Sequence, residues 1–218
     1  MIELAKYIDH TNLKPTATAI EIERLCEEAV SWRFQTVCVN SGNVPVAAAL
    51  LKGTQVGLCS VVGFPLGASL TEVKVFEAQR ARDAGASEID MVLNIAWLQQ
   101  GYDELVFGEI RDVVRAVPDC AVKVIIEASL LDDGQKVRAC EIIKRSGAAF
   151  AKTSTGFSNG GAAVADIRLM RQTLGSDFGV KASGGIRDYA AAIAMLDAGA
   201  TRLGTSASVA ICEQAKGL

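Results

Sequence analysis

Two lysines stand in segments of the sequence where lysine is rarely found. Lys152 lies in F-A-K-T-S-T-G and Lys181 lies in V-K-A-S-G-G-I-R, and both segments otherwise have the apolar character of buried strands. Neighbouring strands lie about 4.8 Å apart, so the two amines reach one cavity if these strands are adjacent. Burial and a nearby cation lower the pKa of an amine, and an uncharged lysine attacks carbonyl carbons. The two lysines therefore indicate Schiff-base chemistry, and we expect both pKa values to be lowered.

Two aspartates also lie in or at the end of apolar segments. Asp90 is part of E-I-D-M-V-L-N, and Asp9 is part of Y-I-D-H-T-N-L. A buried carboxylate needs a partner, and lysine is the obvious one. In V-K-V-I-I-E-A, Lys123 and Glu127 fit an ion pair with each other or with neighbouring residues. Each acid taken alone is as consistent with a structural ion pair as with catalysis, but their occurrence beside two buried lysines favours catalysis.

Composition indicates a single domain over residues 1–218. Of the 218 residues, 50% are hydrophobic and 22% are charged, which suits a compact domain with a large core. The net charge of -3 and the absence of a lysine and arginine cluster argue against partners such as nucleic acids and membrane surfaces. No segment has the roughly 18 apolar residues of a membrane span. We therefore expect a cytoplasmic protein.

Cysteine and histidine content argues against a metal site. There are six cysteines without a C-x-x-C pair, and His10 is the single histidine. The cysteine spacing does not match that of zinc ligands, and a single histidine disfavours a serine–histidine triad. Unpaired cysteines are typical of proteins in a reduced compartment. Cys38 is expected in the core. We expect neither a metal nor another cofactor.

Short apolar runs alternate with segments of helical period, the pattern of repeated β-α units. Eight runs are predicted as strands: Tyr7 to His10, Thr36 to Asn40, Val56 to Gly63, Glu88 to Asn94, Ala121 to Ala128, Phe150 to Thr155, Gly179 to Ser183 and Arg202 to Thr205. Helices are predicted at Ala19 to Trp32, Leu70 to Ala84 and Tyr102 to Val117. Eight units in a chain of this length predict the α/β class and a single closed (β/α)8 TIM barrel with a short N-terminal helical segment, and not an open doubly wound sheet.

Two glycine-rich turns follow the seventh and eighth predicted strands. They are Ser183-Gly184-Gly185 and Gly204-Thr205-Ser206. Barrels of this kind commonly bind phosphate at that place through backbone amides. One isolated pair of glycines is explained by a tight turn alone, but two such turns at the expected place favour a phosphorylated substrate. The turn Gly63 to Gly67 is interpreted as structural.

The motifs together resemble those of deoxyribose-phosphate aldolase, a family of Schiff-base aldolases that work without a metal. The resemblance runs nearly end to end and rests on I-D-H-T-N-L-K-P, T-V-C-V-N, G-F-P-L-G, E-I-D-M-V-L-N, V-K-V-I-I-E, F-A-K-T-S-T-G-F and V-K-A-S-G-G-I-R. It implies a (β/α)8 barrel that reversibly cleaves 2-deoxy-D-ribose 5-phosphate into acetaldehyde and D-glyceraldehyde 3-phosphate. It also implies a homodimer or a higher homo-oligomer.

The resemblance assigns roles to individual residues. Lys152 matches the Schiff-base lysine, Lys181 the second lysine that keeps it reactive, and Asp90 the carboxylate that serves in proton transfer, with Asp9 supporting that relay. The remaining matches are to substrate-binding positions. Thr155 and Gly156 are implied to face the sugar, and Gly184, Gly185, Gly204 and Ser206 to hold the phosphate.

The chain departs from the family pattern at a few positions. Ala207 stands where many members have a serine, so one phosphate contact is either missing or supplied by Thr205 or Ser208. The sequence ends at Leu218 without the terminal tyrosine of some members, and slower proton transfer to the enamine is expected.

Two alternative functions remain for this sequence. One is a phosphosugar isomerase or a different Schiff-base lyase on the same barrel, because a fold does not determine a function. The other is a non-catalytic barrel that binds phosphate. The paired lysines argue against an isomerase, and the presence of Lys152, Lys181 and Asp90 together argues against a protein that only binds.

Overall fold

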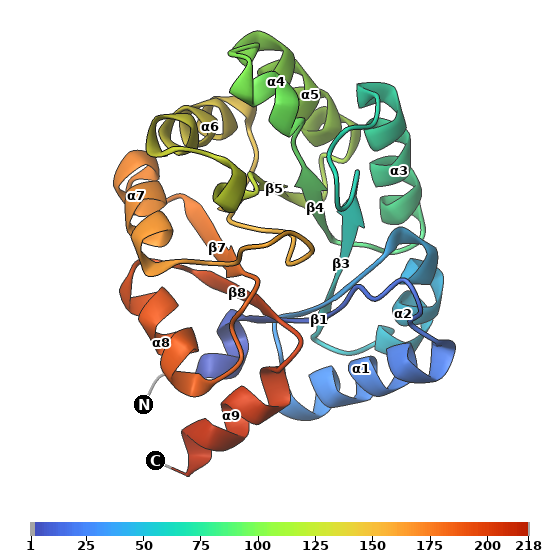
Figure 1. Ribbon diagram of the computed structural model, residues 1–218. Coiled ribbons are helices and arrows are strands. Elements are labelled where there is room, and N and C mark those ends of the chain that lie inside the picture. The colour runs from blue at the N-terminus through green and yellow to red at the C-terminus, as the bar shows by residue number, and fades with distance from the viewer. Residues whose placement is uncertain (1–2, 218) are drawn as a thin grey trace.

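Eight parallel strands form a closed barrel in the computed structural model, which describes residues 3–217 (Figure 1). Each strand pairs with the next along the chain, and β8 pairs with β1. The strands are β1 Ile8–Asn12, β2 Thr36–Val39, β3 Gly57–Val62, β4 Glu88–Val92, β5 Ala121–Ile125, β6 Phe150–Lys152, β7 Gly179–Ser183 and β8 Arg202–Thr205. The predicted (β/α)8 barrel is confirmed.

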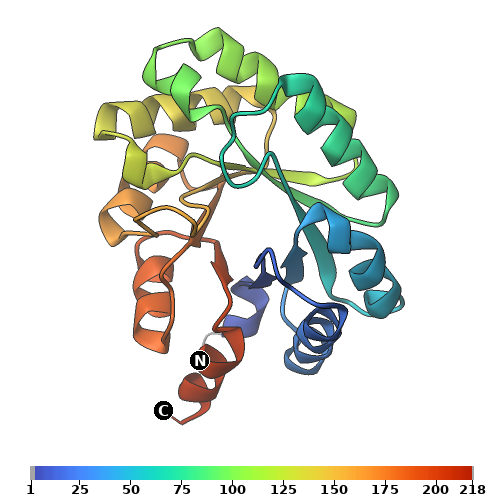
Figure 2. The ribbon, with the colours of Figure 1, turned by 45° about the vertical axis from the view of Figure 1, so that its right-hand side comes forward.

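Helices surround the barrel on its outer side (Figure 2). The helices are η1 Leu4–Tyr7, α1 Ala19–Trp32, η2 Ser41–Asn43, α2 Val44–Leu51, α3 Thr71–Asp83, α4 Ile95–Gln99, α5 Asp103–Ala116, η3 Ala128–Leu130, α6 Asp133–Ser146, α7 Val164–Leu174, α8 Tyr189–Asp197 and α9 Ser208–Lys216. The 3-10 helix η1 is the predicted N-terminal helical segment. Within residues 3–217, no helix combines the length and the hydrophobicity needed to cross a membrane.

The predicted helix bounds agree closely with the structure. Helix α1 has the predicted bounds because Thr18 and Glu21 form a capping box at its start, in which each side chain accepts a hydrogen bond from the other residue's backbone amide. Helices α3 and α5 are shorter than predicted by one residue at each end. At the end of α6, Gly147 takes the left-handed conformation (φ 85°) that releases the chain toward β6.

Several predicted strands are too long at their carboxyl ends. Asn94 lies beyond β4 because its side chain accepts a hydrogen bond from the amide of Trp97 and caps α4. Glu127 lies beyond β5, where its positive φ of 51° turns the chain away from the strand direction. Thr155 likewise lies beyond β6. These polar residues therefore belong to the loops at the end of the barrel where such folds carry their active sites.

The two faces of each strand have different surroundings. On β7, Val180 and Ala182 belong to the large apolar core of the protein, whereas Lys181 between them points to the opposite side. Buried charged side chains occupy part of the barrel interior, together with a small apolar cluster of Leu13, Cys38, Cys59 and Val61. The prediction that Cys38 is a core residue is confirmed, because its side chain is fully buried.

A buried ion pair fastens the loop between β3 and α3 to the neighbouring helix. The Lys74 ammonium of α3 lies 2.6 Å from the Glu109 carboxylate of α5, and both side chains are fully buried. Lys74 also donates hydrogen bonds to the carbonyls of Gly67 (2.7 Å) and Val92 (2.9 Å). Glu109 accepts a hydrogen bond from the amide of Asn94 at 2.9 Å. The pair thus supports the carboxyl ends of β3 and β4.

Removing one charge of this pair is expected to destabilise the fold. Glu109→Gln leaves the Lys74 ammonium buried without its counter-ion, which costs about 3–5 kcal/mol of unfolding free energy. Lys74→Met combined with Glu109→Gln is expected to be less destabilising than the sum of the two single changes, because no unpaired charge remains. Denaturant unfolding of the two single variants and the double variant measures their unfolding free energies. Simple additivity would contradict the proposed coupling.

Candidate active site

Seven charged side chains meet inside the barrel, and we call them the central ion cluster. The cluster consists of Asp9, Glu88, Asp90, Lys123, Lys152, Lys181 and Arg202. Its members come from six strands: β1, β4, β5, β6, β7 and β8. The strand register brings them together, since Asp90 is paired with Lys123 across β4 and β5, and Lys152 with Lys181 across β6 and β7. The predicted adjacency of the two lysines is confirmed.

Asp90 is the carboxylate that three lysines share. Its Oδ1 accepts a hydrogen bond from Lys123 at 2.6 Å, and its Oδ2 accepts one from Lys152 and one from Lys181, each at 2.7 Å. Asp90, Lys123 and Lys181 are fully buried, and Lys152 is 3% exposed. Lys152 and Lys181 thus meet at a single oxygen atom.

Asp9 connects Lys181 to Arg202. Its Oδ2 accepts a hydrogen bond from Lys181, and its Oδ1 accepts one from the Arg202 guanidinium at 2.7 Å. Glu88 pairs with Lys123 at 2.7 Å and with Arg202 at 3.0 Å, and Lys123 also lies 3.8 Å from Asp9. The four sequence-predicted catalytic residues, Lys152, Lys181, Asp90 and Asp9, therefore lie in one continuous network.

The charges of the cluster stabilise one another. Burial alone would raise the pKa of Asp90, but Lys123, Lys152 and Lys181 hold it well below its ordinary value. Burial would lower the pKa of Lys181, but Asp9 and Asp90 raise it above its ordinary value. The prediction of a lowered pKa for Lys181 is therefore wrong. The sequence indicates that lysines and carboxylates pair, but not that both Asp9 and Asp90 contact Lys181.

A cavity of about 480 Å³ opens above the cluster at the carboxyl ends of the strands. Within the described chain, Lys152 is the one cluster member that also lines this cavity. The predicted substrate-binding residues all line it too: Thr155, Gly156, Gly184, Gly185, Gly204 and Ser206. The volume suits a small phosphorylated sugar, since ligand cavities commonly measure about 300–1,000 Å³.

Close contacts between glycines shape one wall of the cavity. Gly184 has a φ of 84°, and a Cβ atom there would lie 3.1 Å from the Cα atom of Gly161 and 3.5 Å from that of Gly156. The loops after β6 and β7 therefore pack backbone against backbone. Gly204 lies within β8, and a Cβ atom on it would lie 3.0 Å from Cε of Lys181. Its lack of a side chain leaves room for that lysine.

Hydroxyl groups near the cavity are already engaged within the protein. Thr155 donates to the carboxylate of Glu127, so Glu127 is a partner of Thr155 and not of Lys123. Thr205 donates to the carbonyl of Ile186 at 2.7 Å and accepts from the amide of Ala207 at 3.0 Å. Ser208 lies 2.8 Å from His10. The two hydroxyls suggested as replacements for a serine at position 207 thus hold the turn in place.

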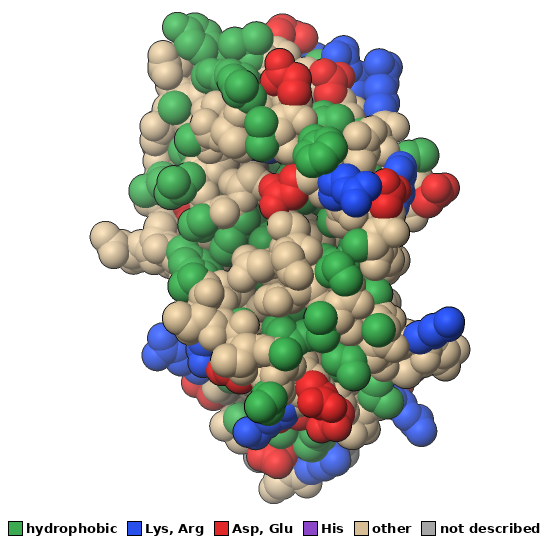
Figure 3. All heavy atoms as spheres, turned by 90° about the vertical axis from the view of Figure 1, so that its right-hand side faces the viewer, with side chains coloured by type: hydrophobic (Ala, Val, Ile, Leu, Met, Phe, Trp, Pro, Cys, Tyr) green, Lys and Arg blue, Asp and Glu red, His purple; other side chains and the backbone are tan. Residues whose placement is uncertain are grey.

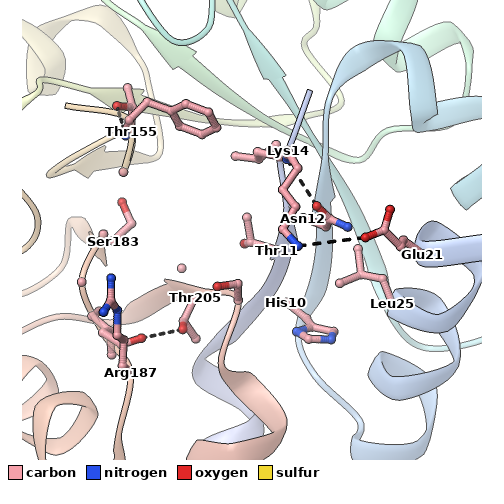
Figure 4. Close-up of a pocket in the computed structure, with 18 of the residues that line it drawn as sticks. His10, Thr11, Asn12, Lys14, Glu21, Leu25, Thr155, Ser183, Arg187 and Thr205 are labelled. Carbon is pink, nitrogen blue, oxygen red and sulfur yellow. Dashed lines mark hydrogen bonds and ion pairs between the residues drawn. The ribbon is translucent and has the colours of Figure 1, made fainter. Parts of the chain in front are cut away.

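Three cluster members and one cavity residue did not emerge from the sequence as site residues. Lys123 was noted only as half of an ion pair, and Glu88 and Arg202 were not singled out. Both of the latter occupy the first position of a strand, where a charged residue has no distinctive pattern. Arg187 of the loop after β7 also lines the cavity (Figure 4). Its position two residues after Gly184-Gly185 was the available signal.

One group of potential metal ligands occurs in the described part of the chain, and it overlaps the cluster. Ligand atoms of Cys38, Cys59 and Asp90 lie within 4.8 Å of one another. However, the Lys123 ammonium lies 3.3 Å from the Cys59 sulfur and 2.6 Å from Asp90. A cation at this place would face that positive charge, so the donor set fits a metal ion poorly.

Comparison with known proteins identifies the family. The model of the DeoC/LacD family aldolases matches residues 3–214. The chain belongs to this family. It is 55% identical to a deoxyribose-phosphate aldolase of Natranaerobius thermophilus, with 94% of each chain covered, and 55% identical to one of Clostridium perfringens, with 97% of this chain and 95% of the relative covered. Membership of an aldolase family argues against both the isomerase and the non-catalytic alternative.

A solved structure has the same barrel. The deoxyribose phosphate aldolase of Aeropyrum pernix, described as a tetramer, superposes with a TM-score of 0.92 at 36% sequence identity. The alignment covers 98% of this chain and 91% of that one. The similarity therefore extends over the whole barrel and includes every strand that contributes to the central ion cluster.

The low pKa of Asp9 predicts a pH-dependent effect on stability. Burial opposes ionisation of Asp9, but Lys181, Lys123 and Arg202 lower its pKa below the ordinary value. Such a carboxylate stabilises the fold above the unfolded-state pKa of about 3.9, and the contribution is lost as the pH falls toward the folded-state value. Asp9→Asn is therefore expected to reduce the unfolding free energy more at about pH 6 than at about pH 3. Urea titrations at the two pH values measure this.

The matched control is Asp119→Asn, because Asp119 is exposed. The unfolding free energy of Asp119→Asn is expected to differ little from that of the unsubstituted protein at either pH. An Asp9→Asn effect that stays constant from about pH 6 to about pH 3 would show that the Asp9 carboxylate is not stabilised by the cluster.

Proposed function

We propose that this protein is a deoxyribose-phosphate aldolase. It reversibly cleaves 2-deoxy-D-ribose 5-phosphate to acetaldehyde and D-glyceraldehyde 3-phosphate through a Schiff base on Lys152, a reaction of deoxyribonucleotide catabolism. The observation that carries the assignment of the lysine is its position: Lys152 belongs to the central ion cluster and also lines the cavity. Lys181 and Lys123 are fully buried beneath it. The reaction proceeds without a metal or another cofactor.

The charge count of the cluster leaves room for one uncharged lysine, and the cavity position favours Lys152 as that lysine. The cluster contains three carboxylates and the four cationic side chains Lys123, Lys152, Lys181 and Arg202. With Lys152 as a free amine, three positive charges balance three negative charges. A Schiff-base nucleophile must be uncharged before it attacks. The cluster therefore remains neutral in the form that reacts.

In the proposed mechanism, the Lys152 amine attacks C1 of the open-chain aldehyde. Loss of water gives an iminium ion, which accepts the electron pair when the bond between C2 and C3 breaks. Asp90, through a water and with the help of Lys181, removes the proton of the C3 hydroxyl, and D-glyceraldehyde 3-phosphate leaves. The remaining enamine is protonated at carbon and hydrolysed to acetaldehyde. Asp9 supports this relay through its hydrogen bond from Lys181.

The phosphate is proposed to bind at the turns after β7 and β8. Gly184, Gly185, Gly204 and Ser206 line this part of the cavity, and Thr155 and Gly156 line the part proposed to face the sugar. Gly185 has open space on the side where a Cβ atom would lie. Arg187 adds a positive charge at the same place, beside Ser183 and Thr205 in Figure 4. A guanidinium is well suited to bind a phosphate dianion.

The proposal extends to the state of the protein in the cell. We propose that residues 1–218 form one catalytic barrel domain, that the protein is cytoplasmic, and that it binds neither nucleic acid nor a membrane. A homodimer or a higher homo-oligomer is supported by apolar side chains that remain exposed on α2 (Val46, Leu50) and α3 (Val73, Phe76). Figure 3 shows apolar side chains among charged ones on the corresponding face. The tetrameric relative from Aeropyrum pernix supports the same view.

Borohydride reduction in the presence of 2-deoxyribose 5-phosphate is expected to attach a reduced adduct to Lys152. Intact-protein mass spectrometry detects the adduct, and peptide mapping locates it. Lys152→Arg keeps a cation beside Asp90 but cannot form the imine, so it is expected to give no adduct and no turnover. An adduct on Lys181 or Lys123 of the unsubstituted protein would refute the assignment.

Arg187→Gln is expected to weaken recognition of the phosphate. The KM for 2-deoxyribose 5-phosphate should rise about tenfold to a hundredfold, because a charged hydrogen bond is worth roughly 1.5–3 kcal/mol. Activity on 2-deoxyribose, which lacks the phosphate, should change much less. Arg168→Gln, at an exposed position of α7, serves as the control. An equal loss on both sugars would mean that Arg187 does not act on the phosphate.

A further inference from the structure

His10 has no part in the proposed reaction, yet it lies at the edge of the cavity. It follows Asp9 on β1, so the two side chains point to opposite sides of the strand. Asp9 points into the central ion cluster, and His10 points toward α1 and α9. The His10 side chain is 3% exposed and lines the cavity below Leu25 in Figure 4. A polar ring at this depth requires hydrogen-bond partners.

Both ring nitrogens of His10 have such partners. Nε2 lies 2.9 Å from a carboxylate oxygen of Glu28 on α1, and the other oxygen of Glu28 accepts a hydrogen bond from Arg24 at 2.8 Å. Nδ1 lies 2.8 Å from the hydroxyl oxygen of Ser208 on α9. The Phe34 ring packs against the imidazole with its centroid 5.1 Å away. The ring is thus held at each nitrogen and on one face.

The protonation of the ring follows from these partners. A carboxylate only accepts hydrogen bonds, so the Nε2 atom of His10 carries a proton and donates it to Glu28. Burial lowers the pKa of His10 and Glu28 opposes this effect, with a lowered pKa as the result. The ring is therefore neutral near neutral pH. Its Nδ1 then accepts a hydrogen bond from the hydroxyl group of Ser208.

Ser208 connects His10 to the turn after β8. Ser208 is the first residue of α9 and follows the turn directly, so a bond that holds its hydroxyl also holds the end of the turn. With its proton donated to His10, the 3.2 Å separation between the Ser208 hydroxyl and the Thr205 carbonyl oxygen is a close contact and not a second hydrogen bond. The Thr205 hydroxyl in turn bridges Ile186 and Ala207, which belong to the loops after β7 and β8. Glu28, His10 and Ser208 thus form a hydrogen-bonded chain from α1 to the start of α9, next to the place where the two proposed phosphate loops meet.

We propose that His10 is a positioning residue that, through Ser208 and with Glu28 behind it, fixes the turn after β8 for the phosphate of the substrate. This inference rests on the proposed phosphate site at the turns after β7 and β8. The identity of the Nδ1 partner carries the inference: Ser208 begins α9 directly after the turn that holds Gly204 and Ser206. His10 makes no contact with the reacting atoms in the proposed mechanism, so its effect should appear in substrate binding.

The test compares turnover of 2-deoxyribose 5-phosphate with turnover of 2-deoxyribose in the variants His10→Leu and Ser208→Ala. Each variant is expected to raise the KM for the phosphorylated sugar about tenfold, the effect of losing a buried hydrogen bond, with kcat nearly unchanged. The loss of kcat/KM on 2-deoxyribose should be much smaller. His10→Gln, which retains a side-chain amide, should recover part of the lost affinity.

A double variant tests whether the two residues act as one unit. His10→Leu combined with Ser208→Ala should be no worse than the more impaired single variant, because both changes break the same chain. Ser208→Ala removes a single oxygen atom and thus keeps the test decisive if His10→Leu fails to fold. Ser146→Ala is the matched control: Ser146 is also buried at a helix end and donates to the Ile143 carbonyl at 2.7 Å, and it does not line the cavity. It should leave both activities unchanged.

Two results would overturn the inference. Equal losses on the phosphorylated and unphosphorylated sugars would reveal a general structural role for His10, and unchanged kinetics in Ser208→Ala would show that the chain does not act on the turn. If the unsubstituted enzyme shows no preference for 2-deoxyribose 5-phosphate over 2-deoxyribose, the proposed phosphate site itself is wrong. The experiment therefore distinguishes an error in the role of His10 from an error in the phosphate site.

Discussion

The barrel interior must keep buried charges in balance, and the rest of the site depends on this constraint. Isolated charges are very costly to bury, and they remain buried only when they are paired and hydrogen-bonded. Asp90 meets this condition by accepting hydrogen bonds from Lys123, Lys152 and Lys181. Asp9 meets it by accepting from Lys181 and Arg202. The balance is complete when one lysine is uncharged, and Lys152 is the cluster lysine that lines the cavity.

The backbone of the barrel makes this arrangement possible. Parallel pairing places Lys152 directly beside Lys181 and Asp90 directly beside Lys123, so that no loop has to position these groups. Gly204 on β8 leaves the space through which the Lys181 side chain runs. Cluster members sit on strands, whereas Thr155, Gly156, Gly184 and Gly185, which are proposed to bind the substrate, sit on loops. The barrel topology therefore holds the catalytic groups rigidly on strands and leaves the binding groups on loops that can vary.

Much of this site was predictable from the sequence because buried lysines are rare. Lys152, Lys181 and Asp90 stand out in apolar segments, and the alternation of strands and helices predicts that they meet. The direction of the Lys181 pKa was not predictable, because it depends on how closely the closed barrel brings Asp9 and Asp90 to this lysine. Glu88 and Arg202 were missed since charged residues at strand starts are common. The hydrogen bonds of Thr205 and Ser208 depend on the geometry of the turn, which the pattern of apolar residues does not predict.

The most direct test of the balanced-charge account is the protonation state of Lys181, measured by NMR titration of the enzyme labelled with 13C at the lysine ε carbons. Lys181→Arg assigns the signal. The account predicts that the Lys181 signal stays in its protonated position at pH values up to and above the ordinary lysine pKa of about 10.4, and that it titrates at lower pH in Asp90→Asn. A Lys181 signal that titrates below the ordinary lysine pKa in the unsubstituted enzyme would contradict it.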